Sequence, residues 1–391
     1  MALGPHNFGG RLAVRILMTV TANSLLDGIN RHILAIASAL NSVGGITVAV
    51  CIVFCQGELT RELERRGVKI YTLDAENGHS LKIFWQFRNV LKDFRPDIIH
   101  AHTLAVLERL YLFVSRNRTK IVQTYHGIGH CGRFENLVHK LLRVNVSGYI
   151  YVSEGVRQFY NRTDTNMQGA QRSVIYNPIK IDVGQNIKSY FGLSGLRHEL
   201  GLGPDIKIIG TACRIARIKQ PTAFISVMIK VAKMNPGVCG VVIGDGDREL
   251  VAKMEQMVSA AGLSERIHLL GYREDAAKLI AEFDVFILTS ISEGMPTAVL
   301  EAMSAGVPVA FWRGRGGLID LEMINQESRF GYCVEGDDVD GLAKCVDRLV
   351  RNISGEYDTF SHMAKCICLK RFSLDVITKQ LISFYRSVLE E

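Results

Sequence analysis

Two glutamates beside a predicted helix start could bind hydroxyl groups, one of a sugar and the other of a ribose. Glu293 follows the apolar run Val285–Leu288, which is typical of a buried strand, and Glu301 lies within the helix expected to follow. We expect this helix to begin at Pro296 and to end at Gly306, because proline favours a first helical position and glycine a helix end. Its free amide groups would suit a diphosphate or sugar hydroxyls, although a solvated Glu301 on an ordinary helix remains the alternative. The residues expected to bind this ligand are Glu293, Gly294, Met295, Pro296, Thr297 and Glu301.

A pair of cations follows an earlier strand. Arg214 and Lys219 come directly after the run Lys207–Ala212, at a predicted turn from strand to helix. The Arg214 guanidinium is a planar fork that can bind two phosphate oxygens at once, and the Lys219 ammonium is a point charge. Together they could hold a pyrophosphate, although basic residues are also common at helix starts without a ligand.

Short β-branched runs alternate with longer amphipathic stretches along the whole chain, which is typical of parallel α/β architecture. The predicted strands of the first half are Val14–Thr21, Thr47–Phe54, Lys69–Leu73, Asp97–His100, Lys120–Thr124, Tyr149–Val152 and Ser173–Ile175. Those of the second half are Lys207–Ala212, Val238–Ile243, Ile267–Leu269, Val285–Leu288 and Val307–Phe311. Helical patterns include Ile29–Asn41, Leu81–Phe94 and a final segment, Leu374–Leu389. The expected fold is therefore two doubly wound parallel sheets with ligands bound outside the carboxyl ends of their strands, in a cleft where these ends face each other.

The length of 391 residues exceeds what one core usually serves, so we expect two Rossmann-like domains, residues 1–190 and 191–371. Residues 1–190 hold 23 Lys and Arg against 13 Asp and Glu, whereas the remainder has a net charge of −3. A basic first domain suggests an anionic partner such as phospholipid headgroups, a pyrophosphate-linked acceptor or nucleic acid, although it could be only a soluble basic surface.

Export and membrane-spanning signals are not recognisable in the sequence. Met1–Ala13 lacks the apolar core of a secretory signal, and no apolar run reaches the length of a spanning helix. The nine cysteines do not form paired zinc-ribbon spacings. We therefore expect a cytoplasmic protein with reduced cysteines.

The C-terminal half resembles the retaining family-4 glycosyltransferases (glycosyl transferases group 1) of the GT-B fold. In that family an Arg-x4-Lys pair grips the donor diphosphate and a Glu-x7-Glu pair holds the donor. Arg214/Lys219 and Glu293/Glu301 have this order and spacing. Gly244 lies in a strand-end turn similar to one in the family, so it is also expected to bind the donor. The final helix, placed at 372–391, resembles one that packs back onto the first domain.

The N-terminal half is similar to the family as well. Gly28 lies in a segment like the family's glycine loop, which approaches the donor phosphate or the acceptor, although the family often has paired glycines where this chain has Asp27-Gly28. By resemblance His126 would lie near the donor sugar and the acceptor hydroxyl. His100 and His102 are expected to serve packing or support. The expected catalytic residues are His126, Glu293, Arg214 and Lys219.

A metal is not expected in the donor site or elsewhere. Asp245 and Asp247 have the spacing of the Asp-x-Asp metal site of another glycosyltransferase fold, but they open a predicted helix, where acidic residues are favoured for another reason. Arg214, Lys219 and the helix dipole could stabilise the diphosphate in place of Mg²⁺. No other cofactor is expected.

The resemblance implies a hexosyl- or N-acetylhexosaminyltransferase that retains the anomeric configuration, with front-face attack and the departing phosphate oxygen as base. A UDP-sugar is the favoured donor. The expected acceptor is a saccharide or a polyprenyl-pyrophosphate-linked saccharide, which would place the protein at the inner leaflet of the plasma membrane. Such an enzyme would take part in bacterial surface-polysaccharide or lipopolysaccharide synthesis.

Two alternatives belong to other classes. A nucleotide-sugar 2-epimerase shares the fold but needs no acceptor, and the Arg-x4-Lys and Glu-x7-Glu pairs favour a transferase over it. A non-catalytic nucleic-acid-binding protein would explain the basic first half. It would leave the glutamate pair without a role, and the sequence lacks basic runs interleaved with aromatic residues.

Overall fold

The computed structural model describes residues 13–21, 28–54, 57–75, 82–103, 111–112, 119–129, 146–163, 169–179, 195–352 and 355–390. The chain divides into two compact units, one formed by Met1–Lys180 with Leu374–Glu391 and the other by Ile181–Ser373. The boundary predicted between residues 190 and 191 lies outside the described residues.

The first unit contains a seven-stranded sheet in the order β3-β2-β1-β4-β5-β6-β7, and every neighbouring pair is parallel. Its strands are β1 (Val14–Val20), β2 (Ile46–Ile52), β3 (Lys69–Thr72), β4 (Ile98–Ala101), β5 (Lys120–Tyr125), β6 (Gly148–Tyr151) and β7 (Gln171–Val174). Nearly every residue of β1 and β2 is buried. This explains their continuous apolar runs, because helices cover both faces of a parallel sheet.

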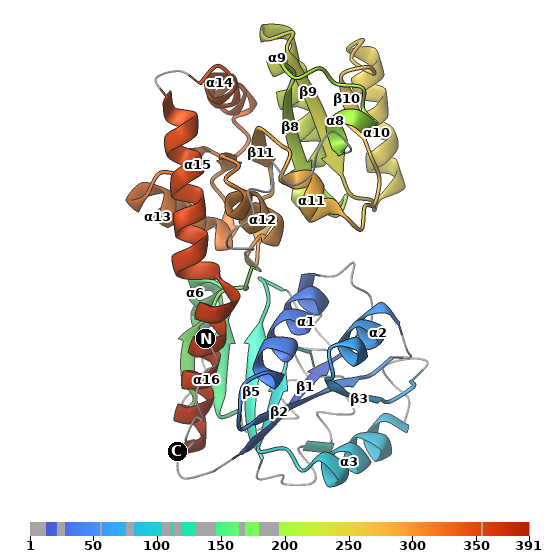
Figure 1. Cartoon of the computed structure of the whole chain (residues 1–391), viewed down its shortest axis with the longest axis vertical. Coiled ribbons are helices and arrows are strands. Elements are labelled where there is room, and N and C mark those ends of the chain that lie inside the picture. The colour runs from blue at the N-terminus through green and yellow to red at the C-terminus, as the bar shows by residue number, and fades with distance from the viewer. Residues whose placement is uncertain are drawn as a thin grey trace. The chain divides into compact units, whose positions relative to one another are not determined.

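The helices of the first unit cover the two faces of this sheet (Figure 1). They are α1 (Gly28–Asn41), α2 (Glu58–Arg65), α3 (Lys82–Phe94), α6 (Glu154–Thr163) and α16 (Leu374–Glu390). Apolar side chains of α1 and α16 share one core with β1 and β2, and those of α3 share another core on the opposite face. Phe384 and Val388 of α16 fill the space above Gly148, where a β-carbon would lie 2.8 Å from the Phe384 ring. The last helix of the chain is therefore part of the core of the first unit.

The second unit has a six-stranded parallel sheet in the order β10-β9-β8-β11-β13-β15 and a short pair, β12 and β14. The strands are β8 (Lys207–Ala212), β9 (Val238–Ile243), β10 (Ile267–Leu269), β11 (Val285–Leu288), β12 (Ser292–Glu293), β13 (Val309–Trp312), β14 (Arg315–Gly316) and β15 (Gly331–Val334). The strands β8 to β11 have the predicted bounds, whereas β12, β14 and β15 were not predicted.

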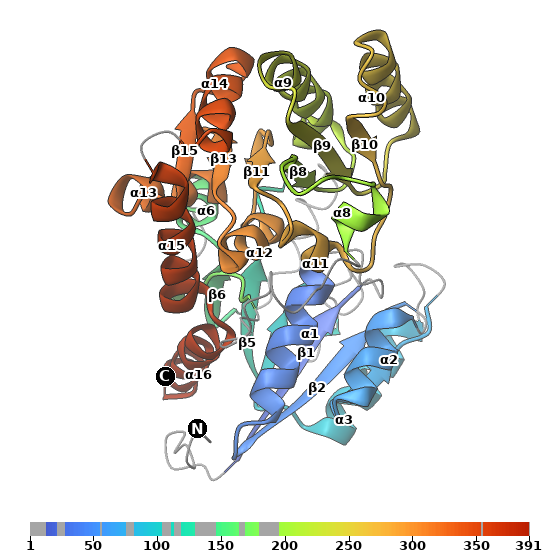
Figure 2. The same cartoon turned by 45° about the horizontal axis from the view of Figure 1, so that its top comes forward.

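The helices α9, α10 and α14 pack beside one another, and α11 and α12 form a separate contacting pair (Figure 2). The helices of this unit are α8 (Leu196–Glu199), α9 (Pro221–Met234), α10 (Arg248–Ala260), α11 (Ala276–Ile280), α12 (Thr297–Ala305), α13 (Gly317–Glu327), α14 (Val339–Val350) and α15 (Glu356–Ile367). A 3-10 turn at Arg217–Lys219 precedes α9, and a wide helical turn at Cys368–Phe372 follows α15. Within the described part of the chain, no helix has the length and apolar character needed to cross a bilayer.

The strand predicted at Val307–Phe311 begins two residues later in the structure, as β13. Val307 instead closes α12, since its amide donates to the carbonyl of Ala302 and Gly306 has a left-handed φ of 78°. This is a glycine-terminated helix end, which uses the residue after the glycine to satisfy a terminal carbonyl. The helix-stop signal therefore takes precedence over the β-branched run at this point.

Both sheets reverse their strand order beside their first strand, between β1 and β4 in one unit and between β8 and β11 in the other. Doubly wound sheets bind ligands at such a switch point, outside the carboxyl ends of the strands. The prediction of two Rossmann-like parallel-sheet domains is confirmed. In each unit the segments after these strands should carry the functional side chains.

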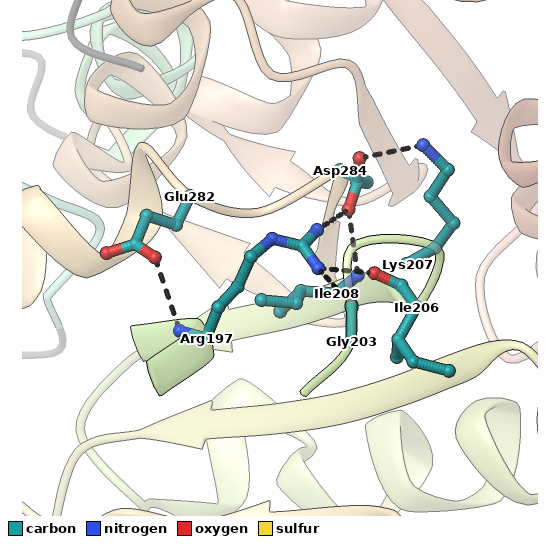
Figure 3. A network of polar contacts seen from close by, with 7 residues as sticks. All are labelled: Arg197, Gly203, Ile206, Lys207, Ile208, Glu282 and Asp284. Atoms are coloured by element: carbon teal, nitrogen blue, oxygen red, sulfur yellow. Dashed lines mark hydrogen bonds and ion pairs between the residues drawn. The ribbon is translucent and has the colours of Figure 1, made fainter. Parts of the chain in front are cut away.

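The amino-terminal ends of β8 and β11, at the other end of these strands from the switch point, are held together by the carboxylate of Asp284 (Figure 3). One of its oxygens accepts from the Ile208 amide at 2.9 Å and from the Arg197 guanidinium at 3.1 Å, and the other lies 3.4 Å from Lys207 Nζ. Arg197 also donates to the carbonyl of Ile206 at 2.7 Å. Asp284 thus joins the starts of β8 and β11 to the segment before them, and its role is structural.

Candidate functional site

The switch point of the second unit brings the two predicted motifs into direct contact. Lys219 Nζ lies 2.5 Å from Glu293 Oε2, although the two residues are 74 positions apart. The Glu293 side chain is only 9% exposed and that of Lys219 21%. The carboxyl-end edge of the sheet therefore holds a largely buried ion pair, which joins the two motifs expected to bind one ligand.

Backbone contacts fix the turn that carries Lys219. The hydroxyl of Thr289, just after β11, donates to the carbonyls of Lys219 at 3.1 Å and Gln220 at 3.0 Å. The amide of Ile291 donates to the carbonyl of Ile218 at 2.9 Å. Gln220 has a left-handed φ of 50°, which the surrounding contacts must hold in place. The segments after β8 and β11 are thus joined at Lys219.

The segment that carries Arg214 is held by the turn after β9. The Ile215 amide donates to the carbonyl of Asp245 at 2.9 Å, and the Ile215 carbonyl accepts from Asp247 at 2.9 Å. Gly244 has a φ of 134°, and a β-carbon on it would lie 1.9 Å from the Cys213 carbonyl oxygen. Gly244, which was expected to bind the donor, is therefore needed for the close approach of these two segments. Arg214 itself is exposed at the edge.

The acidic pair Asp245 and Asp247 has a local structural use. The Asp247 carboxylate accepts from the amides of Glu249 at 3.0 Å and Leu250 at 3.3 Å, so it caps α10. The Asp245 carboxylate accepts from the amide of Gly246 at 2.7 Å. The Asp247 contacts are those of an ordinary helix N-cap, whereas the Asp245 contact lies in the turn before the helix.

The helix α12 presents its N-terminus immediately after Glu293. It runs from Thr297 to Ala305, and Pro296 is its N-cap, so the prediction that Pro296 is the first helical residue was wrong by one position. Pro296 has an extended ψ of 100° and gives no side-chain cap. The Pro296 carbonyl accepts from the amides of Val299 and Leu300, and the amides of Thr297 and Ala298 at the start of α12 suit an anion. Glu301 lies one turn into the helix and is partly buried.

A glycine-rich segment completes this edge and was missed in the sequence. Arg315 and Gly316 form β14, which pairs with β12, and the Arg315 amide donates to the carbonyl of Ile291 at 3.0 Å. A β-carbon on Gly317, the first residue of α13, would lie 2.3 Å from the Gly294 carbonyl oxygen. Arg315 is exposed. The signal was the run Gly314-Arg315-Gly316-Gly317 between a buried strand and a helix.

Cys213 lies next to this group but offers no thiolate. Burial raises the pKa of its thiol to about 12, and the Glu293 carboxylate adds to the shift while Lys219 opposes it. A thiol with this pKa is protonated at neutral pH and is a poor nucleophile.

The switch point of the first unit carries a cluster of histidines. His32 comes from α1, His102 follows β4, and His126 follows β5. His102 Nδ1 and His126 Nε2 are 2.8 Å apart, and the His32 ring packs edge-on against both of the other rings. The structure therefore places His126 with His102, as a hydrogen-bonded pair. His32 was not singled out in the sequence.

His100 packs against this cluster and is itself held by two hydroxyl groups. Its ring nitrogens lie 2.7 Å from the Tyr385 hydroxyl of α16 and 2.7 Å from the Thr124 hydroxyl of β5. Its ring is 4.2 Å from that of His102, centroid to centroid. Both nitrogens of His100 are therefore in use, as its expected packing role requires.

Burial keeps these imidazoles neutral. It lowers the pKa of His32 to about 4, against a smaller upward effect of a hydrogen bond with Asn177. It lowers the pKa of His100 to about 3, with a further contribution from His32. The pKa values of His102 and His126 also fall well below the ordinary value, first through burial and then through neighbouring histidines. The cluster can exchange hydrogen bonds or bind a metal ion, but it carries no charge at neutral pH.

Gly28 is the exposed first residue of α1, on the same side of the first sheet as His32. Asp27 lies outside the described residues, whereas residues 28–32, which were expected to belong to the glycine loop, form the first turn of α1. What the structure shows of Gly28 is therefore its position at a helix start.

Two family models match the chain. Residues 26–183 match the family described as Glycosyltransferase Family 4, and residues 206–352 match the one described as Glycosyl transferases group 1. The first match lies mostly in the first unit and the second wholly in the second, and together they cover most of the chain. Both models describe transferases, which favours sugar transfer over the epimerase and nucleic-acid-binding alternatives.

The curated relatives include bacterial enzymes whose names specify different acceptors. The chain is 26% identical over 282 residues to the UDP-Gal:alpha-D-GlcNAc-diphosphoundecaprenol alpha-1,3-galactosyltransferase of Escherichia coli, covering 68% of this chain and 70% of that protein. It is 24% identical over 335 residues to the N-acetyl-alpha-D-glucosaminyl L-malate synthase of Bacillus anthracis, covering 83% of each. The family thus includes relatives with both lipid-linked and small acceptors.

Solved structures show the same fold. The Anabaena protein HepE in complex with UDP and glucose has a TM-score of 0.79 at 21% identity, over 96% of this chain and all of that one. A glycosyltransferase from Rickettsia africae has a TM-score of 0.81 at 18% identity, over 97% of this chain and 99% of that one. The likeness agrees with the predicted GT-B fold. With one family model matched in each half and this fold throughout, the chain belongs to the family-4, or group 1, glycosyltransferases.

Proposed function

We propose that the protein transfers a hexosyl or N-acetylhexosaminyl group from a UDP-sugar with retention of the anomeric configuration. The observation that carries this proposal is the Lys219–Glu293 ion pair, largely buried at the switch point of the second sheet. It joins a cation suited to a diphosphate with a carboxylate suited to sugar hydroxyls, in the place where doubly wound sheets bind nucleotides.

The diphosphate would lie against the cationic side of this edge. Arg214 is exposed after β8, Lys219 is fixed by the segment after β11, and the N-terminus of α12 follows Glu293. Negative charge grows on the leaving diphosphate during transfer, so donors that are already in place lower the barrier without reorganisation. We propose that these groups supply the stabilisation that a metal ion gives in other glycosyltransferases.

The two glutamates would hold different parts of the donor. Glu293 would accept hydrogen bonds from sugar hydroxyls while it remains paired with Lys219. Glu301, one turn into α12, would accept from the ribose hydroxyls. Each carboxylate then binds a neutral polyol edge, which costs less than placing it against the diphosphate.

Retention is proposed to follow front-face attack. The Glu293 carboxylate is engaged by Lys219, and the Cys213 thiol is protonated, so neither is a ready covalent nucleophile. The departing phosphate oxygen would take the proton of the acceptor hydroxyl. The neutral His126 would position that hydroxyl through a hydrogen bond.

The acceptor is proposed to be a saccharide on a polyprenyl diphosphate, at the inner leaflet of the plasma membrane. The net charge of +10 on residues 1–190 suits a diphosphate lipid at an anionic surface, and the Escherichia coli relative is described as acting on a diphosphoundecaprenol substrate. The pathway class would be surface-polysaccharide or lipopolysaccharide assembly. Failure to sediment with anionic liposomes at low salt would contradict the membrane part.

The donor proposal is tested by thermal unfolding with UDP, GDP, ADP and CMP and their sugar conjugates, with and without EDTA. UDP and one UDP-sugar should raise the unfolding temperature, and EDTA should not change the shift. Lys219→Ala should weaken UDP binding about 10- to 100-fold, because a charge-assisted contact is worth about 1.5–3 kcal/mol.

Lys230→Ala is the matched control, because Lys230 pairs with Asp340 on the surface of the same unit. It should bind UDP as the unaltered protein does. A rise in the unfolding temperature with GDP or ADP but not with UDP would contradict the assignment of uracil as the donor base. A rise that requires Mg²⁺ would contradict the metal-free site. A product of inverted configuration, read from the anomeric coupling constant by NMR, would contradict retention.

A further inference from the structure

We propose that His32, His102 and His126 form a binding site for a transition-metal ion of the Zn²⁺ class in the first unit. One ligand-capable atom of each side chain lies within 4.8 Å of those of the other two. The three residues come from separate segments of the chain, which the sheet brings together at its carboxyl-end edge. This site is distinct from the donor groups of the second unit.

The spacing of the rings suits three imidazoles around one ion. Their centroids are 5.4 Å apart for His32 and His102, 5.0 Å for His32 and His126, and 5.1 Å for His102 and His126. A tetrahedral Zn²⁺ with metal–nitrogen bonds of about 2.0–2.1 Å places ring centroids about 5 Å apart. The ring centres therefore already have the spacing that an ion requires, and rotation of the rings would bring the ligand nitrogens, now within 4.8 Å of one another, to the roughly 3.3 Å of a tetrahedral site.

The hydrogen bonds of the cluster leave it incomplete without an ion. His102 Nδ1 and His126 Nε2 share one proton across 2.8 Å, and an ion that replaces it would require the two nitrogens to separate by about 0.5 Å. His32 Nδ1 is buried without a hydrogen-bond partner. A buried, unsatisfied ring nitrogen is unfavourable, which is a reason to expect another ligand here.

The chemistry of the ligands selects the class of metal. Three neutral imidazoles suit Zn²⁺, Co²⁺, Ni²⁺ or Cu²⁺, whereas Mg²⁺ and Ca²⁺ prefer oxygen ligands. Three protein ligands leave a fourth position open to water or another small molecule. His126 is only half-buried, and it gives an ion a route from solvent.

Two neighbours would support the ligands without binding the ion. The Asn177 side chain is close enough to raise the pKa of His32, and from this position it could orient the imidazole as the neighbours of metal-ligating histidines do. His100 packs against the His102 ring, but its nitrogens are engaged by Tyr385 and Thr124. We therefore assign three ligands and exclude the fourth histidine.

A bound ion would also inhibit sugar transfer, and this consequence rests on the proposed function. His126 would then donate its lone pair to the metal and could not position the acceptor hydroxyl. Micromolar Zn²⁺ should thus lower turnover, whereas Mg²⁺ should leave it unchanged. The binding of UDP, which involves the second unit, should not respond to Zn²⁺ at equal concentration.

The binding test uses the full chain freed of metal by chelation, without nucleotide. Equilibrium dialysis should show one Zn²⁺ per chain, and Co²⁺ should give the visible absorption of a tetrahedral complex. His126→Ala and His102→Ala should each weaken the affinity for Zn²⁺ at least about tenfold, because each removes one of three ligands. His362→Ala is the matched control, because His362 and Cys366, 3.4 Å apart on α15, are a competing surface pair.

Circular dichroism and the UDP response of each variant show whether it is folded. If His102→Ala does not fold, the test relies on His126→Ala alone. No saturable Zn²⁺ binding by the unaltered chain would overturn the site. So would binding that is lost in His362→Ala and kept in His126→Ala. One-to-one binding with unchanged turnover would support the metal site and overturn the role proposed for His126, so the two proposals fail in different ways.

Discussion

At the scale of single residues, glycines allow the backbone segments that carry the charged side chains of the second unit to approach one another closely. Gly244, Gly246 and Gly317 each place their backbone where a β-carbon would lie within 2.3 Å of a carbonyl oxygen of a neighbouring segment. Real β-carbons do not approach this closely, so these positions require glycine. The charged residues of the donor edge therefore depend on neighbours that make no contact with a ligand.

Gly244→Ala should destabilise the second unit by about 2–4 kcal/mol, because it combines a clash at 1.9 Å with the strain of φ 134°. It should also weaken UDP binding by displacing the segment that carries Arg214. Urea unfolding and UDP titration measure the two effects. Gly203→Ala is the control, since its β-carbon would meet nothing within 4 Å. Equal free energies of unfolding for the two variants would show that the turn after β9 accommodates a β-carbon and would contradict the prediction.

At the scale of elements, the two ends of the second sheet have separate tasks. The carboxyl ends of β8 and β11 present Arg214, Lys219 and Glu293, and their starts are joined by Asp284. The Asp284 carboxylate is 9% exposed and holds two cations and a backbone amide. Stability at one end can therefore change while the chemistry at the other end is preserved.

Asp284→Ala should lower the free energy of unfolding by about 2–4 kcal/mol, because it leaves the Ile208 amide and the Arg197 guanidinium without their acceptor. Asp284→Asn should lower the free energy of unfolding by less, since its side chain keeps one acceptor oxygen. Chemical unfolding gives these values, and UDP binding should be unchanged wherever the protein is folded. The comparison is Asp340→Ala on the exposed surface pair with Lys230, which should not alter stability. If Asp284→Ala were as stable as Asp340→Ala, the structural role would be wrong.

At the scale of the molecule, the chain returns to its first unit after completing the second. The helix α16 contributes Leu381, Tyr385 and Val388 to the core that α1 and β1 form, and Tyr385 also binds His100. The second unit has a core of its own, formed by residues within its own boundaries. The first unit therefore depends on the end of the chain and the second does not.

Removal of residues 374–391 should unfold the first unit and leave the second folded. Each fully buried apolar side chain that is lost contributes about 1.5–3 kcal/mol, so several together exceed the stability of a typical domain. Hydrogen exchange should show fast exchange in β1, β2 and β4 and continued protection in β8, β9 and β11. Tyr385→Phe, which removes only the hydroxyl contact, should cost about 1 kcal/mol and keep both units folded. Protection of β1 in the truncated chain would contradict this dependence.

The sequence alone was sufficient for the fold class and for much of the donor edge. Buried parallel strands must be continuously apolar, so β8, β9, β10 and β11 could be predicted to the residue. Arg214, Lys219, Glu293 and Glu301 could be predicted because strand ends and helix starts have local signals. The short strands β12 and β14 could not, because their pairing depends on a glycine-rich segment that local patterns describe only as a loop.

Only the tertiary structure decided which side chains meet. Lys219 and Glu293 are far apart in the sequence, and His32, His102 and His126 come from three segments. Strand order in a doubly wound sheet places the ends of the first and fourth strands side by side, and no local sequence signal encodes that order. The sequence therefore determined the chemical groups and the elements that carry them, whereas packing of the whole sheet determined the ion pair and the histidine cluster.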